Sequence, residues 1–134
     1  RPPRSTLLPY TTLFRSRTVE EPLALVDALT RESRPGHAVL VDCLTLWLSN
    51  LMHAERDPAI EARRLTRFLG VALHPIVFVS NEVGMGLVPE TPLGRAFRDA
   101  QGRLNQAVAA AVPNVAFVAA GLPLWLKRGA HQES

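Results

Sequence analysis

The sequence has 134 residues, 47% of them hydrophobic and 20% charged, a composition typical of one soluble globular domain rather than of a disordered chain. The formal net charge of +3 comes from residues 1–16, which hold three of the 15 basic residues and no acid; the remainder has 12 basic and 12 acidic residues. Because this remainder is balanced in charge, no basic face is expected and a nucleic-acid partner is disfavoured.

Cysteine content and apolar patterning exclude further classes. The single cysteine, Cys43, excludes an internal disulfide and is compatible with a reducing cytoplasm. One cysteine and four scattered histidines make no zinc pattern. The longest apolar tract, residues 107–126, is interrupted at Pro113 and Pro123, which favours a helix, a turn and a strand over a membrane span. We therefore expect a cytoplasmic protein without a membrane span.

Residues 1–16 differ from the rest of the chain. Residues 6–16 resemble the translation of a sequencing-library adapter joined in frame to a gene, and the composition changes at Arg17. We expect residues 1–16 to be a non-native segment and residues 17–134 to be the carboxy-terminal part of a longer protein. The alternative is a disordered amino-terminal arm.

The first predicted elements are a helix and a strand. Thr18 and Glu21 have the spacing of a capping box, which predicts a helix that starts there, with Glu20 in its first turn, and that ends at residues 33–36. Residues 38–42 predict a buried strand that ends in Asp42. A carboxylate at the tip of a hydrophobic strand can hold the Mg²⁺ of a nucleotide, although many strands end in aspartate without such a role.

Two helices are predicted next. Residues 44–52 read as a largely buried helix, in which Trp47, Asn50 and His53 are expected to pack in the core or at its rim. Asp57 caps the following helix, whose apolar positions repeat at helical spacing. Three arginines of that helix are expected on a solvated face, with phosphate binding as the minority alternative: Arg63, Arg64 and Arg67.

Residues 75–90 are the strongest candidate for a functional site. Residues 76–79 predict a strand buried on both faces, and three polar side chains follow it at once: Ser80, Asn81 and Glu82. In open parallel sheets, ligands bind beyond the carboxyl ends of the strands. Gly84 and Gly86 give the following loop conformational freedom, and Thr91 is placed to cap a new helix. The alternative is an ordinary loop between a strand and a helix.

The helix after Thr91 is predicted to have an apolar stripe from Leu93 to Ala111. Arg95 and Arg98 fall early in this helix and could reach a phosphate or a carboxylate at the polar strand tip, or could form salt bridges on the helix surface. Two later segments complete the pattern, a third apolar strand at 115–118 and an edge strand or packed tail at 121–126.

The order of the elements predicts an α/β fold, a parallel sheet with flanking helices and right-handed crossovers. No G-x-x-x-x-G-K-[ST] motif occurs in the sequence. A nucleotide-binding sheet of this kind would therefore lack its first strand and its phosphate-binding loop.

Two segments carry a family resemblance: residues 39–51 (VLVDCLTLWLSNL) and residues 80–90 (SNEVGMGLVPE), of which the string NEVGMGxVPE is highly specific. Three shorter segments extend the match: 17–20, 97–99 and 102–106. Together they resemble the bifunctional adenosylcobinamide kinase / adenosylcobinamide-phosphate guanylyltransferase family. The resemblance implies a P-loop NTPase fold of the RecA-like type, acting in the assembly of the nucleotide loop of cobalamin.

The resemblance also implies an activity and site residues. Such enzymes phosphorylate adenosylcobinamide with ATP or GTP, then transfer GMP from GTP to adenosylcobinamide-phosphate through a guanylylated histidine. By likeness, Glu20 and Asp42 match nucleotide-binding acids, and Asp42 would also suit Mg²⁺. Asn81 and Glu82 would lie at the same sheet edge, facing the nucleotide or the corrinoid. The family further suggests a homo-oligomer.

This sequence departs from the family pattern in two ways. The family's P-loop and its nucleophilic histidine both lie before the position of Arg17, and neither is present here. We therefore expect the polypeptide as given to be catalytically inactive. Two other hypotheses stay open: another RecA-like P-loop ATPase, or a non-catalytic α/β binding module. The coding sequence upstream of Arg17 would separate them, since only the resemblance predicts a P-loop followed by that histidine.

Overall fold

The computed structural model describes residues 16–130, so almost all of the segment expected to be non-native lies outside the described residues. In the described range, helices and strands are interspersed along the chain, with one short 3₁₀ helix before the longest α-helix. The elements are α2 (Leu25–Glu32), β1 (Val39–Asp42), α3 (Leu44–His53), α4 (Pro58–Leu69), β2 (Ile76–Val79), η2 (Val83–Met85), α5 (Pro92–Ala111), β3 (Val115–Ala119) and β4 (Leu122–Lys127).

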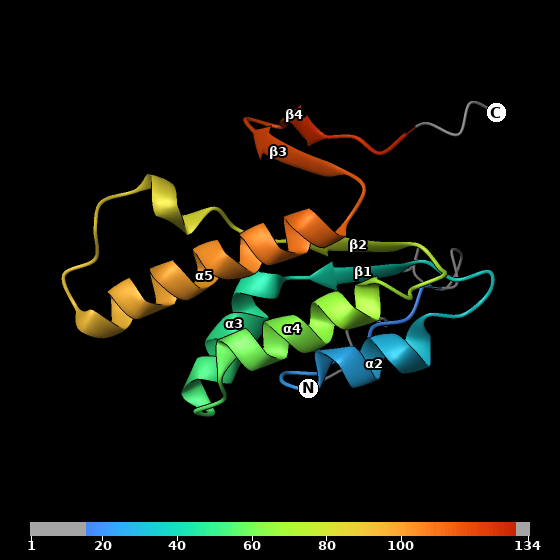
Figure 1. Ribbon diagram of the computed structural model, residues 1–134, viewed down its shortest axis with the longest axis horizontal. Helices are drawn as coiled ribbons and strands as arrows, with labels where there is room; N and C mark the ends of the chain where they lie inside the picture. Colours follow the sequence, from blue (N-terminus) through green and yellow to red (C-terminus); the bar gives the residue numbers. More distant parts are fainter. Residues whose placement is uncertain (1–15, 131–134) are drawn as a thin grey trace.

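Strands β1 and β2 form a two-stranded parallel sheet. Val39 lies opposite Ile76 at one end of the register, and Asp42 lies opposite Val79 at the other. Helices α3 and α4 make the crossover between the two strands, as a parallel pair requires. The prediction of an α/β fold with a parallel sheet and flanking helices is thus confirmed for these two strands (Figure 1).

One hydrophobic core joins the helices to one face of this sheet. Its most buried side chains come from α3 and α4: Leu44, Leu48 and Leu51 are each 1% exposed and Leu65 is fully buried. The inward side chains of the sheet pack against this core, among them Val41 and Phe78. The predicted packing of Trp47 in the core is also confirmed, since it is 5% exposed.

The other face of the sheet is exposed, so the prediction that residues 76–79 are buried on both faces is wrong for the described chain. Leu40 is 65% exposed and its register partner Val77 is 59% exposed. Successive side chains of a strand point to opposite faces, and the described helices cover only the face that carries Val41 and Phe78. The outer face therefore presents apolar side chains with no cover among residues 16–130.

The capping predictions have mixed outcomes. The Asp57 carboxylate accepts a hydrogen bond from the Ala59 N–H and caps α4, and the Thr91 hydroxyl accepts one from Gly94 and caps α5, as predicted. The predicted helix start at Thr18 is wrong. Residues 16–20 are not helical, and α2 begins at Leu25. The Glu21 carboxylate accepts hydrogen bonds from the backbone of the two residues before α2, which closes a turn there instead.

The last two strands form a separate hairpin, so the third apolar run does not join the parallel sheet. β3 pairs with β4 in antiparallel fashion, and Ala119 lies opposite Leu122. The two-residue turn has positive φ at both Ala120 and Gly121, the geometry that matches the twist of a hairpin. The chain therefore reverses at once instead of crossing back to β2. No helix of residues 16–130 is long and apolar enough to cross a membrane.

Candidate functional site

The carboxyl ends of β1 and β2 bring the predicted polar residues to one edge of the sheet. Because Asp42 lies opposite Val79, it ends its strand beside the start of the Ser80–Asn81–Glu82 segment. Asp42 is exposed, and its carboxylate has no hydrogen-bond or salt-bridge partner within residues 16–130. A cis peptide bond joins it to Cys43, whose sulfur is half-buried and accepts a hydrogen bond from Leu46 at the start of α3.

This edge can be tested for a fit to Mg²⁺. Within the described range, no group of three or more His, Cys, Asp or Glu side chains could enclose a metal ion. Magnesium does not need such a group, because it keeps several waters and is often held by one or two carboxylates together with substrate phosphates. A single exposed carboxylate at the strand end, Asp42, fits that mode of binding.

The segment after β2 is held from both sides. The Asn81 N–H donates to the Thr45 hydroxyl of α3 at 2.9 Å, and the Asn81 carbonyl accepts from the Asn105 side-chain amide of α5 at 3.1 Å. The Ser80 hydroxyl donates to the Asn105 side-chain oxygen at 2.6 Å. Helices α3 and α5 therefore fix the backbone of the predicted site edge.

A fifth residue, Gln101, completes this network and was missed by the sequence reasoning. Gln101 is fully buried, and its Nε2 donates to Ser80 Oγ at 3.1 Å and to Asn105 Oδ1 at 2.8 Å. Its Oε1 is buried with no partner among the described residues, and an unmet acceptor of this kind costs about 1–3 kcal/mol. The available signal was a polar residue on the apolar stripe of α5, four residues after Phe97 and three before Leu104.

Arg95 and Arg98 hold the loop that follows the site edge. Arg95 donates to the carbonyls of Pro89 and Glu90, at 3.2 and 2.9 Å, and Arg98 donates to the carbonyl of Gly84 at 3.1 Å. Neither forms a salt bridge with an acid in the described chain, so the surface-salt-bridge alternative is wrong there. Both guanidinium groups keep the loop close to the first turns of α5.

No hydrogen bond or salt bridge among the described residues ties Glu20 to the sheet edge. Glu20 is exposed in the segment before α2, and no hydrogen bond or salt bridge links it to another described residue. Its neighbour Glu21 has a defined role. The backbone N–H groups of Ala24 and, secondly, Leu23 hold the pKa of the Glu21 carboxyl below its ordinary value of 4.5.

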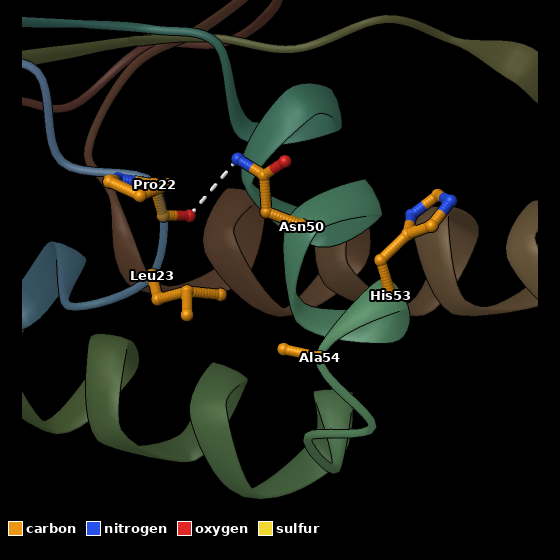
Figure 2. Close-up of a pocket in the computed structure, with 5 residues that line it drawn as sticks. All are labelled: Pro22, Leu23, Asn50, His53 and Ala54. Atoms are coloured by element: carbon orange, nitrogen blue, oxygen red, sulfur yellow. Dashed lines mark hydrogen bonds between the residues drawn. The ribbon is translucent and has the colours of Figure 1, made fainter.

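A shallow hollow lies where the chain enters α2, away from the sheet edge (Figure 2). It is lined by Pro22, Leu23, Asn50, His53 and Ala54. The Asn50 side-chain amide donates to the Pro22 carbonyl at 3.1 Å, and the Nδ1 of His53 hydrogen-bonds the Ser49 carbonyl of its own helix at 2.7 Å. The half-buried Asn50 thus packs at the core rim, as predicted, whereas His53 is exposed and its hydrogen bond stays within its own helix.

Comparison with known proteins decides the family. The sequence model of the family described as cobinamide kinase / cobinamide phosphate guanyltransferase matches residues 15–126. The chain belongs to this family. The resemblance carried by residues 39–51 and 80–90 is thereby confirmed.

Three relatives show how much of a cobinamide kinase / cobinamide phosphate guanyltransferase this chain covers. It is 45% identical over 113 residues to the bifunctional adenosylcobalamin biosynthesis protein CobP of Pseudomonas aeruginosa, a match covering 83% of this chain and 65% of the relative. It is 36% identical over 126 residues to the corresponding CobU proteins of Escherichia coli and of Salmonella typhimurium, covering 83% of this chain and 70% of each relative. The chain thus spans about two thirds of the length of these relatives.

Proposed function

We propose that this chain is part of an enzyme that phosphorylates adenosylcobinamide and then transfers GMP from GTP to adenosylcobinamide-phosphate. The observation that carries the proposal is the family match over residues 15–126, which contains the whole of the β1–β2 edge. The relatives are named as bifunctional proteins of adenosylcobalamin biosynthesis, and the family description names both a kinase and a guanyltransferase. ATP and GTP are the proposed nucleotide substrates, and the cytoplasm is the proposed location.

The proposed roles of the site residues follow from their placement. Asp42, exposed at the end of β1, would hold Mg²⁺ directly or through water, and the ion would offset charge that develops on the phosphates. Asn81 and Glu82, exposed beyond the neighbouring strand, would face the nucleotide or the corrinoid. Glu20 is proposed to contact the nucleotide on the basis of the family resemblance alone.

We further propose that residues 17–134 are the carboxy-terminal part of one P-loop domain of the RecA-like type. Two observations support this. The match leaves about a third of the P. aeruginosa relative uncovered, and the outer face of the β1–β2 sheet exposes Leu40 and Val77. A sheet of a parallel α/β domain is normally covered on both faces. Assembly into a homo-oligomer is a proposal from the family, supported by the exposed apolar side chains of β4.

A chimeric protein tests the function. The chimera joins the part of the P. aeruginosa relative that precedes its counterpart of Arg17 to residues 17–134 of this chain. It is expected to phosphorylate adenosylcobinamide and to form the GMP-linked product, whereas Asp42→Asn in the chimera is expected to lower both rates by about 100-fold. Asp27→Asn is the matched control, because Asp27 is an exposed aspartate on α2.

Three outcomes discriminate the hypotheses. Turnover of both corrinoid substrates, lost with Asp42→Asn and kept with Asp27→Asn, supports the proposal. Nucleotide hydrolysis that does not depend on a corrinoid would instead favour another RecA-like ATPase. A folded chimera with neither activity would favour the binding module.

A further inference from the structure

The polar network at the end of β2 includes a residue on the buried stripe of α5, where the neighbouring positions are apolar. Gln101 occupies a fully buried position of α5, between the half-buried Phe97 and the buried Leu104. An apolar side chain of similar size would fill this position without leaving an unmet acceptor. What the amide adds is a pair of donated hydrogen bonds, one to Ser80 of the segment after β2 and one to Asn105, which holds that segment.

The orientation of the Gln101 amide is set by its partners. Asn105 Oδ1 accepts from both the Ser80 hydroxyl and Gln101 Nε2, at 2.6 and 2.8 Å. Turning the Gln101 amide over would place its oxygen against Asn105 Oδ1, two acceptors without a proton between them. Asn105 is fixed in turn, because its oxygen is engaged twice and its Nδ2 is therefore directed at the Asn81 carbonyl.

We propose that Gln101 and Asn105 are positioning residues that set the direction of the Asn81–Glu82 segment at the ligand-binding edge. Neither residue is proposed to touch a substrate. Gln101 fixes Asn105, and Asn105 fixes the Asn81 carbonyl, while Thr45 holds the Asn81 N–H from the opposite side. With the peptide groups on both sides of Asn81 anchored, the backbone from which the Asn81 and Glu82 side chains project is held in place.

The identity of the ligand in this proposal rests on the proposed function, whereas the anchoring itself does not. The test is therefore made on the full 134-residue chain without a ligand. Amide hydrogen exchange is measured at Asn81 and, as an internal reference, at Val41 of β1. Thr45→Val removes the acceptor of the Asn81 N–H and shows the exchange rate of that amide when it is released.

Two substitutions remove the network at different points. Gln101→Leu keeps the side-chain volume and removes both donated bonds. Asn105→Asp keeps an acceptor for Ser80 and Gln101 but removes the donor to the Asn81 carbonyl. Each is expected to speed exchange at Asn81 by about tenfold relative to Val41. Gln106→Leu is the control, because Gln106 lies on the exposed face of the same helix.

Each outcome decides the matter. Selective release of Asn81 in both variants, with Gln106→Leu unchanged, supports positioning. Equal acceleration of hydrogen exchange at Asn81 and Val41 would mean that the network only stabilises the whole fold. Unchanged exchange at Asn81 would mean that the network does not anchor this segment. Either result overturns the proposal. Should Gln101→Leu fail to fold, Asn105→Asp gives the same comparison. A chimera inactive toward corrinoids would refute the proposed function and leave this result intact.

Discussion

The two faces of the β1–β2 sheet should respond differently to the same substitution, Val→Thr. Val41 packs against the helical core, whereas Val77 is 59% exposed on the outer face. At Val41 the change removes one methyl group from the core, worth about 0.8 kcal/mol, and buries a hydroxyl that costs about 1–3 kcal/mol when unpaired. Since Val41 is only half-buried, we expect Val41→Thr to lower the free energy of unfolding by about 1–2 kcal/mol.

At Val77 the new hydroxyl stays hydrated, so Val77→Thr should change the free energy of unfolding by less than about 0.5 kcal/mol. Urea unfolding followed by tryptophan fluorescence measures both, because Trp47 is buried in the core and reports its loss. Equal destabilisation at the two positions would refute the conclusion that only one face of the sheet is packed against a core, and would mean that the outer face is covered as well. In the chimera, where we propose that the outer face is covered, the cost of Val77→Thr should rise toward that of Val41→Thr.

Three further predictions concern helix ends and the loop after β2. Asp57→Ala should destabilise the chain by about 1 kcal/mol in the same assay, because the Ala59 N–H loses its acceptor; no change would show that the cap is unimportant. The pKa of Glu21 is lowered, so the stability that its carboxylate contributes is present above pH 4.5 and is lost as the pH falls through the folded-state pKa. Urea unfolding at a series of pH values should therefore show a smaller loss of unfolding free energy on acidification in Glu21→Gln than in the parent chain. The same pH dependence in both proteins would contradict the assignment. Arg98→Met removes the hydrogen bond to the Gly84 carbonyl and should speed thermolysin cleavage within residues 84–91 about fivefold. Arg103→Met, on the exposed face of α5, should leave the cleavage rate unchanged. Equal cleavage rates in the two variants would exclude the loop contact.

Local patterns in the sequence identified most of the elements. Strands at 38–42 and 76–79 were predicted from short β-branched runs and are observed at Val39–Asp42 and Ile76–Val79. The caps Asp57 and Thr91 were predicted from residue type followed by proline. These features depend on near neighbours in the chain, so a single sequence contains the information.

What local patterns could not predict depends on distant partners. An apolar run shows that a strand avoids water but not which element covers each face, so the exposure of Val77 was missed. The run at 115–118 was placed in the parallel sheet because the two-residue turn at Ala120 and Gly121 was not recognised. Thr18 had capping-box spacing, yet the Glu21 carboxylate closes a turn further along the chain.

The candidate site was predictable in part for the same reason. Asp42, Asn81 and Glu82 were predicted to share one sheet edge because they end or follow apolar strands, and parallel pairing brings those strand ends together. Arg95 and Arg98 were found as residues near the loop, but their contacts to loop carbonyls depend on a backbone path that the sequence does not show. The partnership of Gln101 with Ser80 likewise spans α5 and the end of β2.

The most direct test of the ligand-binding edge uses a paramagnetic metal. The chimera is loaded with GTP and with Mn²⁺ in place of Mg²⁺. In its NMR spectrum, the broadening of the backbone amide signals then shows which residues lie near the ion. Ion binding at Asp42 predicts that the strongest broadening on residues 17–134 falls at residues 42–46 and 80–84, and that Asp42→Asn abolishes it. Strong broadening centred on α2 or on the β3–β4 hairpin, or broadening that survives Asp42→Asn, would contradict a nucleotide–metal site at the carboxyl ends of β1 and β2.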